Sequence, residues 1–150
     1  MGQKQLQQQL LNRGLFQEFA IADYSFVKSL LFAKNNLSVE EFRLYQQLWQ
    51  VLNKPFPKPD ILVYFHRDIS ILERFIKLRG RSYEEMIQPA YLQKIQDTYF
   101  EYFRNILSYP VLIIDLNELD FVENKGHYES LKHLLSREYL PGVHRISLVM

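Results

Sequence analysis

Length, composition and charge limit the classes of protein to which this chain can belong. It has 150 residues, 47% of them hydrophobic, which suffices for one substantial core and favours a single domain. The formal net charge of +1 provides no strong field to attract polyanions, so a nucleic acid is not expected as a partner. The absence of cysteine excludes disulfides, zinc–thiolate sites and thiol nucleophiles, and is compatible with a cytoplasmic protein.

The amino-terminal third predicts one strand and three helical segments. Apolar residues at near-helical spacing from Leu6 to Leu11, with no preceding cap, indicate the end of a helix and suggest that sequence upstream has been removed. The run from Phe19 to Ala22, closed by Asp23, predicts a buried strand. A helix is expected from Phe26 to Ala33, where two asparagines end the pattern.

The next helix begins at a capping box, in which Ser38 and Glu41 satisfy each other's backbone donors. Its apolar positions recur at helical spacing and predict a buried face. These positions are Phe42, Tyr45, Leu48, Trp49 and Leu52.

Strands and helices alternate through the rest of the chain. The uncharged run from Ile61 to Phe65 predicts a central parallel strand covered on both faces, and it is far too short to cross a membrane. The other expected elements are helices from Asp68 to Gly80, Pro89 to Ser108 and His127 to Arg137, and strands from Val111 to Ile114 and Ile146 to Val149. This alternation predicts an α/β fold with a parallel sheet.

A cluster of four cations surrounds Gly80, where the helix after the central strand is expected to end. The cations are Arg74, Lys77, Arg79 and Arg81. Cations at the end of a helix complement its macrodipole, and glycine is the usual left-handed cap. Arginine forks beside a glycine hinge also suit a lid that closes over phosphate oxygens. Both interpretations can hold together.

Three other patterns are discounted. The tripeptide from His66 to Asp68 matches part of the protein-kinase catalytic loop, but Glu73 stands where that loop needs a metal-binding asparagine. His127 and His133 are six residues apart, which places them on opposed sides of a helix, so no metal site is predicted. The aromatic residues from Tyr99 to Phe103 recur at helical spacing and are expected to fill a core rather than to stack on bases.

Several segments, in the right order, resemble the deoxynucleoside kinases, and in particular the bacterial deoxyadenosine and deoxyguanosine kinases. They cover nearly the whole chain and comprise residues 21–34, 42–49, 59–68, 78–84, 91–96, 111–115 and 120–121. The resemblance implies a three-layer parallel sheet of the P-loop nucleoside and nucleotide kinase type. It also implies one kinase domain over residues 1–150, with a lid at about residues 74–85.

The resemblance further implies transfer of the γ-phosphate of ATP to the 5'-hydroxyl of a deoxynucleoside, with Mg²⁺ bridging the phosphates. Arg79 and Arg81 match the lid arginines that hold the transferring group, and Glu84 matches the lid carboxylate that reaches the sugar 3'-hydroxyl. Asp23 matches the acidic member of an acidic residue–arginine pair beside the active site, but Tyr24 replaces the arginine, as in the purine-deoxynucleoside subgroup. The residues implied to contact ATP are Lys77, Asn117, Glu118, Asp120 and Phe121.

The five glycines supply no Gly-x-x-x-x-Gly-Lys-Ser/Thr, so the sequence contains no phosphate-binding loop. The resemblance places this loop on a first strand and a catalytic Glu after a second strand, both upstream of these residues, so we expect an incomplete fold and an inactive isolated chain. The missing first strand would leave two ladders exposed, favouring direct pairing of the remaining strands or self-association. The alternatives are the carboxyl-terminal domain of a bifunctional pterin pyrophosphokinase fusion, and a non-catalytic module for nucleotide binding or oligomerisation. The resemblance also implies a homodimer through the helices at Phe26 to Ala33 and Phe42 to Leu52.

Overall fold

A computed structural model describes residues 21–23, 25–54, 58–84 and 86–147, and the chain divides into two compact units, residues 1–58 and 59–150. A single kinase domain was expected over residues 1–150. Whether the two units form one domain is not tested by their separate structures, so this stays a prediction. The helix expected from Leu6 to Leu11 lies outside the described residues, as do Phe19 and Ala20. Ile21 and the residue after it are described, and they do not form the predicted strand.

Two helices form the described part of the first unit, α2 (Phe26–Asn36) and α3 (Val39–Asn53). The predicted capping box is confirmed, because the Glu41 backbone N–H donates to Ser38 Oγ at 3.3 Å and the Ser38 N–H donates to Glu41 Oε2 at 2.9 Å. The prediction that α2 stops before the two asparagines is wrong. Both belong to its last turn, where the Asn35 side chain donates to the Leu31 carbonyl at 3.0 Å.

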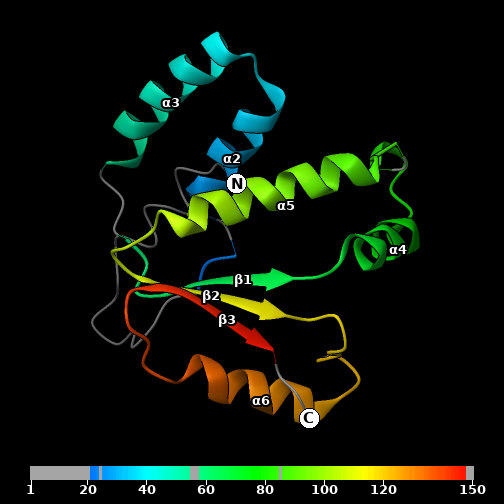
Figure 1. The fold of residues 1–150 in the computed structure, drawn as a ribbon. Coiled ribbons are helices and arrows are strands. Elements are labelled where there is room, and N and C mark those ends of the chain that lie inside the picture. Colours follow the sequence, from blue (N-terminus) through cyan, green and yellow to red (C-terminus); the bar gives the residue numbers. More distant parts are fainter. Residues whose placement is uncertain (1–20, 24, 55–57, 85, 148–150) are drawn as a thin grey trace. The chain divides into compact units, whose positions relative to one another are not determined.

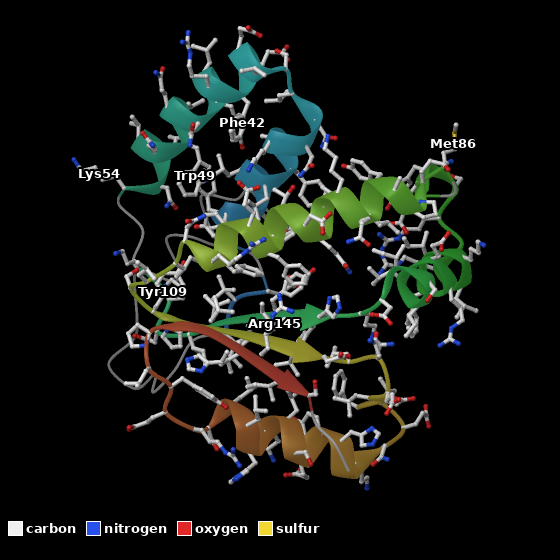
Figure 2. The ribbon with its side chains drawn as sticks, viewed as in Figure 1. Phe42, Trp49, Lys54, Met86, Tyr109 and Arg145 are labelled. Carbon is white, nitrogen blue, oxygen red and sulfur yellow. The ribbon has the colours of Figure 1, made fainter. Side chains whose placement is uncertain are left out.

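The two helices of the first unit contact each other through an aromatic pair. The Trp49 ring stacks on Phe26 with centroids 5.7 Å apart, and its Nε1–H donates to the Phe26 carbonyl at 3.0 Å. Figure 2 shows Trp49 on the side of α3 turned toward α2. The predicted buried face of α3 is only partly formed, because none of its residues is buried, and Leu48 and Leu52 are 55% and 46% exposed.

A parallel sheet forms the centre of the second unit (Figure 1). In the described residues it has three strands in the order β1 (Leu62–His66), β2 (Pro110–Asp115) and β3 (Gly142–Ser147). The prediction that the first of these strands is central and covered on both faces is wrong for the described sheet. There β2 is the middle strand, and Phe65 of β1 is 48% exposed.

Helices cover both faces of this sheet. In Figure 1, α5 (Pro89–Arg104) lies along one face and α6 (Lys125–Leu135) along the other, while α4 (Ile69–Arg79) follows the carboxyl end of β1. Successive side chains of β2 enter two different cores. Leu112 packs in a cluster with Leu131 of α6, whereas Val111 packs in a cluster with Phe103 of α5. The predicted three-layer α/β fold and the aromatic core role of α5 are confirmed.

Several element ends of the second unit differ from the predictions, including the end of α6, which lies at Leu135 rather than Arg137, and three of the differences have a local reason. Helix α5 ends at Arg104 rather than Ser108. The prediction ran too far because Ile106, which lies beyond the helix, is also buried and continues the apolar pattern. Helix α6 begins before His127, since the Asn124 side chain caps it. Strand β3 begins at Gly142 rather than Ile146, because only one of its two faces is covered and its sequence has no continuous apolar run. Among the described residues, no helix has the length and apolarity needed to cross a membrane.

Candidate functional site

The carboxyl ends of β1 and β2 lie side by side, and a polar residue ends each of them. His66 is the register partner of Asp115 in the parallel pair. In open parallel α/β sheets, ligands bind outside the carboxyl ends of the strands. The segments that leave these two strands, residues 67–68 and 116–124, are therefore where a ligand is expected.

Asn117 connects the two segments. Its side-chain oxygen accepts from the Asp68 backbone N–H at 2.8 Å, and its own N–H donates to Asp115 Oδ1 at 2.9 Å. The backbone adds a second connection between the two segments, because the Leu116 N–H donates to the His66 carbonyl at 2.9 Å. The oxygen of Asn117 thus holds the start of α4 against the end of β2. Its predicted contact with ATP stays a prediction.

The 117–124 loop is closed by short polar side chains. Asp120 Oδ1 accepts from the backbone N–H groups of Val122 and Glu123 at 2.9 and 3.0 Å. Bonds from the backbone of Glu123 and Val122, in that order, lower the pKa of the Asp120 carboxyl. Asn124 caps α6, and His127, which is only 8% exposed, lies with its Nδ1 at 3.0 Å from the Asp120 backbone nitrogen. The loop therefore has a defined conformation rather than that of a loose surface connection.

Two other residues predicted to contact ATP lie in different surroundings within this loop. The Phe121 ring lies 6.1 Å from Phe65, centroid to centroid, and packs against the core between β2 and α6. Glu118 is exposed. Contacts of these two side chains with ATP stay predictions.

The lid segment turns at Gly80, which adopts the left-handed conformation with φ 63° and ψ 31°. This residue caps α4, and a short 3₁₀ helix, η1 (Ser82–Glu84), follows. The predicted helix end with a glycine cap is confirmed, since the Gly80 N–H bonds to carbonyls of the last turn. The turn places one lid arginine on each side of the glycine.

Arg79 and Arg81 converge on one carboxylate oxygen. Each Nη1 lies 3.4 Å from Glu84 Oε1. The two arginine side chains are 54% and 52% exposed, whereas the Glu84 side chain is only 12% exposed. Arg81 also donates to the Tyr83 hydroxyl at 3.0 Å. This hydroxyl has the largest effect on the pKa of the Arg81 guanidinium group and raises it, and the negative charge of Glu84 raises it further. The structure thus brings together three of the predicted site residues.

This arrangement fits an anion. Two guanidinium groups that share one acceptor oxygen can share a phosphate oxygen in the same way, with stronger charge on the acceptor. Glu84 Oε2 is buried and has no hydrogen-bond partner among the described residues. The two half-exposed arginines, held by a single carboxylate oxygen, can exchange that carboxylate for a more strongly charged anion.

The other predicted site residues are not brought to the lid by anything described. Lys77 lies exposed in the last turn of α4. Asp23 is exposed and belongs to the first unit, just before α2, and Tyr24 lies outside the described residues. The roles implied for these three stay predictions.

The sequence did not reveal two residues that lie near the carboxyl ends of β1 and β2, Arg67 and Gln96. The Gln96 side chain, on the buried side of α5, donates to the Arg67 carbonyl at 2.7 Å, and Arg67 Nη2 donates to the Leu119 carbonyl at 3.1 Å. The tripeptide from His66 to Asp68 was discounted as a match to the protein-kinase catalytic loop, and no role was assigned to Arg67. A polar residue at an apolar helical position is the one signal that pointed to Gln96.

Known proteins match this chain over most of its length. The family described as deoxynucleoside kinase matches residues 3–140. A deoxyguanosine kinase of Bacillus subtilis is 30% identical over 115 residues, covering 74% of this chain and 56% of that protein. Deoxyadenosine kinases of Lactobacillus acidophilus and Dictyostelium discoideum are 28% and 31% identical, covering 83% and 87% of this chain.

The chain spans only part of these relatives, 65% of the Lactobacillus protein and 56% of the Dictyostelium protein. The family match nevertheless takes in β1 and β2, together with the lid and the 117–124 loop, and it ends before β3 begins. On the family match, the parallel sheet between helical layers and the paired arginines at the lid turn, this chain belongs to the deoxynucleoside kinase family.

Proposed function

We propose that this chain is the carboxyl-terminal part of a kinase that transfers the γ-phosphate of ATP to the 5'-hydroxyl of a purine deoxynucleoside. The convergence of Arg79 and Arg81 on one oxygen, at the turn after α4, carries the proposal. Phosphoryl transfer needs positioned cations where negative charge develops. The names of the relatives, deoxyguanosine kinase and deoxyadenosine kinase, support the purine substrates.

Each lid residue has a role in this proposal. Arg79 and Arg81 leave Glu84 and bind oxygens of the transferring phosphoryl group, stabilising its charge. Glu84, once released, accepts a hydrogen bond from the 3'-hydroxyl of the sugar, which discriminates against analogues that lack this group. Gly80 provides the turn about which the segment closes.

The residues present fit ATP as the phosphate donor. The guanidinium groups of the lid are half exposed and held by a carboxylate, which has only acceptors, so they form a donor set that suits phosphate oxygens. The 117–124 loop would border the adenine with its backbone. Mg²⁺ would supply positive charge that offsets the charge of the phosphates, and no residue of this chain is assigned to hold it.

A polypeptide of these 150 residues is expected to lack kinase activity. Its sequence contains no Gly-x-x-x-x-Gly-Lys-Ser/Thr, and the lid alone supplies neither a cradle for the β-phosphate nor a base for the 5'-hydroxyl. Two alternatives remain within this picture. One is a bifunctional protein with a pterin pyrophosphokinase domain upstream, and the other is a non-catalytic module that binds nucleotides or oligomerises.

We further propose a homodimer formed through α2 and α3. Several apolar residues on the surface of α3 support it, including Leu44 and Val51, which are 63% and 71% exposed. The proposed protein works in the cytoplasm, where ATP is available and where the cysteine-free sequence is compatible with a reducing compartment.

An activity measurement tests the proposed reaction. The purified chain, given ATP, Mg²⁺ and deoxyadenosine or deoxyguanosine, is expected to form no nucleotide above background. The same chain joined behind an upstream kinase segment that carries Gly-x-x-x-x-Gly-Lys-Ser/Thr is expected to gain activity, and Arg81→Met should lower the resulting kcat by about two orders of magnitude or more. Turnover by the chain alone would refute its inactivity. A well-folded joined protein that binds ATP without turnover would favour the binding module.

A further inference from the structure

Arg67 joins two segments that lie at the carboxyl ends of β1 and β2 and are far apart in sequence. It follows β1 directly, and its Nη2 donates to the carbonyl of Leu119 at 3.1 Å, 52 residues further along the chain. A charged donor on a backbone carbonyl is stronger than a neutral one. This bond fixes the middle of the 117–124 loop.

The same guanidinium group also contacts the helix that leads to the lid. Its central carbon lies 4.6 Å from the centroid of the Phe75 ring, in α4, which is a cation–π geometry. Phe75 is 41% exposed, so the ring serves as a platform at the surface rather than as part of the core. Arg67 is therefore held between α4 on one side and the 117–124 loop on the other.

The position of Arg67 is fixed from a third side. Gln96 of α5, only 6% exposed, donates to the Arg67 carbonyl at 2.7 Å. Because that glutamine is buried, its donor is not exchanged freely with water, and it restrains the backbone from which the arginine projects. The three contacts involve α4, α5 and the loop after β2, so they constrain the direction of the side chain.

We infer that Arg67 is a positioning residue that holds the 117–124 loop in the conformation that borders the base of an adenine nucleotide. The inference rests on the proposed function, which places adenine at this loop. It predicts that loss of Arg67 weakens the part of nucleotide binding that depends on the base, because the loop is no longer fixed. Binding of the phosphates by the lid arginines stays unchanged.

Two variants remove the contact in different ways. Arg67→Met keeps an unbranched side chain but removes the charge and the bond to Leu119, and Phe75→Leu removes only the aromatic platform. Arg67→Lys keeps the charge and is expected to keep part of the binding. Arg104→Met is the matched control, because Arg104 is an exposed arginine in the last turn of α5.

Two measurements on the full chain test the inference. Hydrogen–deuterium exchange of peptides from residues 116–124 is expected to speed up in Arg67→Met and, less, in Phe75→Leu, while β2 and α6 exchange as in the wild type. Titration with ADP and with inorganic tripolyphosphate separates base from phosphate binding. Arg67→Met should weaken ADP binding about tenfold, the order expected for losing a charge-assisted bond, and leave tripolyphosphate binding unchanged.

The outcomes separate this inference from the proposed function. If the wild-type chain binds neither probe, the nucleotide role of Arg67 fails, whereas the proposed function is tested separately by turnover of the joined protein. If the wild type binds ADP and Arg67→Met binds it equally well, the role of Arg67 alone is overturned. If Arg67→Met weakens the binding of ADP and of tripolyphosphate equally, or speeds up hydrogen exchange throughout the second unit, Arg67 only stabilises the fold. Recovery of ADP binding in Arg67→Lys supports the inference.

Discussion

Glu84 has two possible partners in the proposed reaction, the lid arginines and a sugar hydroxyl. In the structure it holds both arginines through Oε1. Replacing it with glutamine removes the charge that competes with phosphate. The arginines of these ion pairs are half exposed, and exposed pairs contribute about 0.2–1 kcal/mol, so Glu84→Gln is expected to tighten tripolyphosphate binding about two- to fivefold at low salt.

The control for this change is Glu129→Gln, which removes an exposed ion pair with Lys132 on α6 and should leave the affinity unchanged. Titration calorimetry at two ionic strengths measures both variants. Weaker tripolyphosphate binding in Glu84→Gln would show that the carboxylate orders the arginines rather than competing for them.

Burial of Tyr64 gives the second unit a pH dependence in alkali. Desolvation, with a smaller effect of Tyr99, raises the pKa of the Tyr64 hydroxyl from 10.0 to about 12. Because the folded pKa lies above the unfolded one, this contribution to stability is complete below about pH 10 and is lost as the pH rises toward 12. Tyr64→Phe should therefore flatten the loss of stability in this range, as measured by urea unfolding at a series of pH values. An unchanged slope would contradict this.

The residues of the site differ in how far the sequence revealed them. Arg79, Arg81 and Glu84 were predicted because they fall close together on a recognisable segment. Arg67 was not, because its partner, the Leu119 carbonyl, lies 52 residues away and a backbone acceptor leaves no mark in the sequence. Side chains that bind distant backbone are found only when the fold brings them together.

The lid turn depends on a backbone conformation that only some residues adopt readily. A Cβ at Gly80 would meet no atom within 4 Å, so the cost of Gly80→Ala comes from the left-handed φ of 63° and not from a clash. We expect a loss of about 1 kcal/mol in the free energy of unfolding, together with weaker tripolyphosphate binding as Arg81 moves away from Arg79. Gly80→Asn should cost less, because asparagine tolerates this region. Equal stability of the alanine variant and the wild type in urea would contradict the prediction.

The apolar surface of α3 tests the proposed dimer. Leu48 is 55% exposed, and a charge placed there should disrupt an interface on this surface. Leu48→Glu is expected to raise the dimer dissociation constant at least tenfold in sedimentation equilibrium, whereas Gln47→Glu, at an exposed neighbouring position, adds the same charge and should have less effect. A wild-type chain that stays monomeric at all concentrations would refute the dimer.

Elements were predicted well where a local signal marks them and poorly where it does not. The capping box of α3 and the glycine cap of α4 each depend on residues within a few positions of one another, and both are confirmed. The end of α5 and the start of β3 were misplaced, because tertiary burial of Ile106 and one-sided covering of β3 set them. The exposure of α3 was missed because helical periodicity shows which face is apolar without showing what covers it.

For the whole molecule, alternation of strands and helices was enough to predict a parallel sheet, and the resemblance to deoxynucleoside kinases added the two helical layers. The order of the strands was not predictable from it, since a periodic pattern carries no information about which strand neighbours which. The described sheet gives β1 one neighbour, β2. The strand expected to pair on its other side stays a prediction, as does self-association through that edge.

The central claim is that Arg79 and Arg81 together form a phosphate grip, and titration of the chain with ATP tests it most directly. The wild type and Arg104→Met should bind ATP alike, Arg79→Met and Arg81→Met should each bind at least tenfold more weakly, and the double variant should show no saturable binding. Equal ATP affinity in all these variants, with each shown to be folded by circular dichroism, would contradict the account.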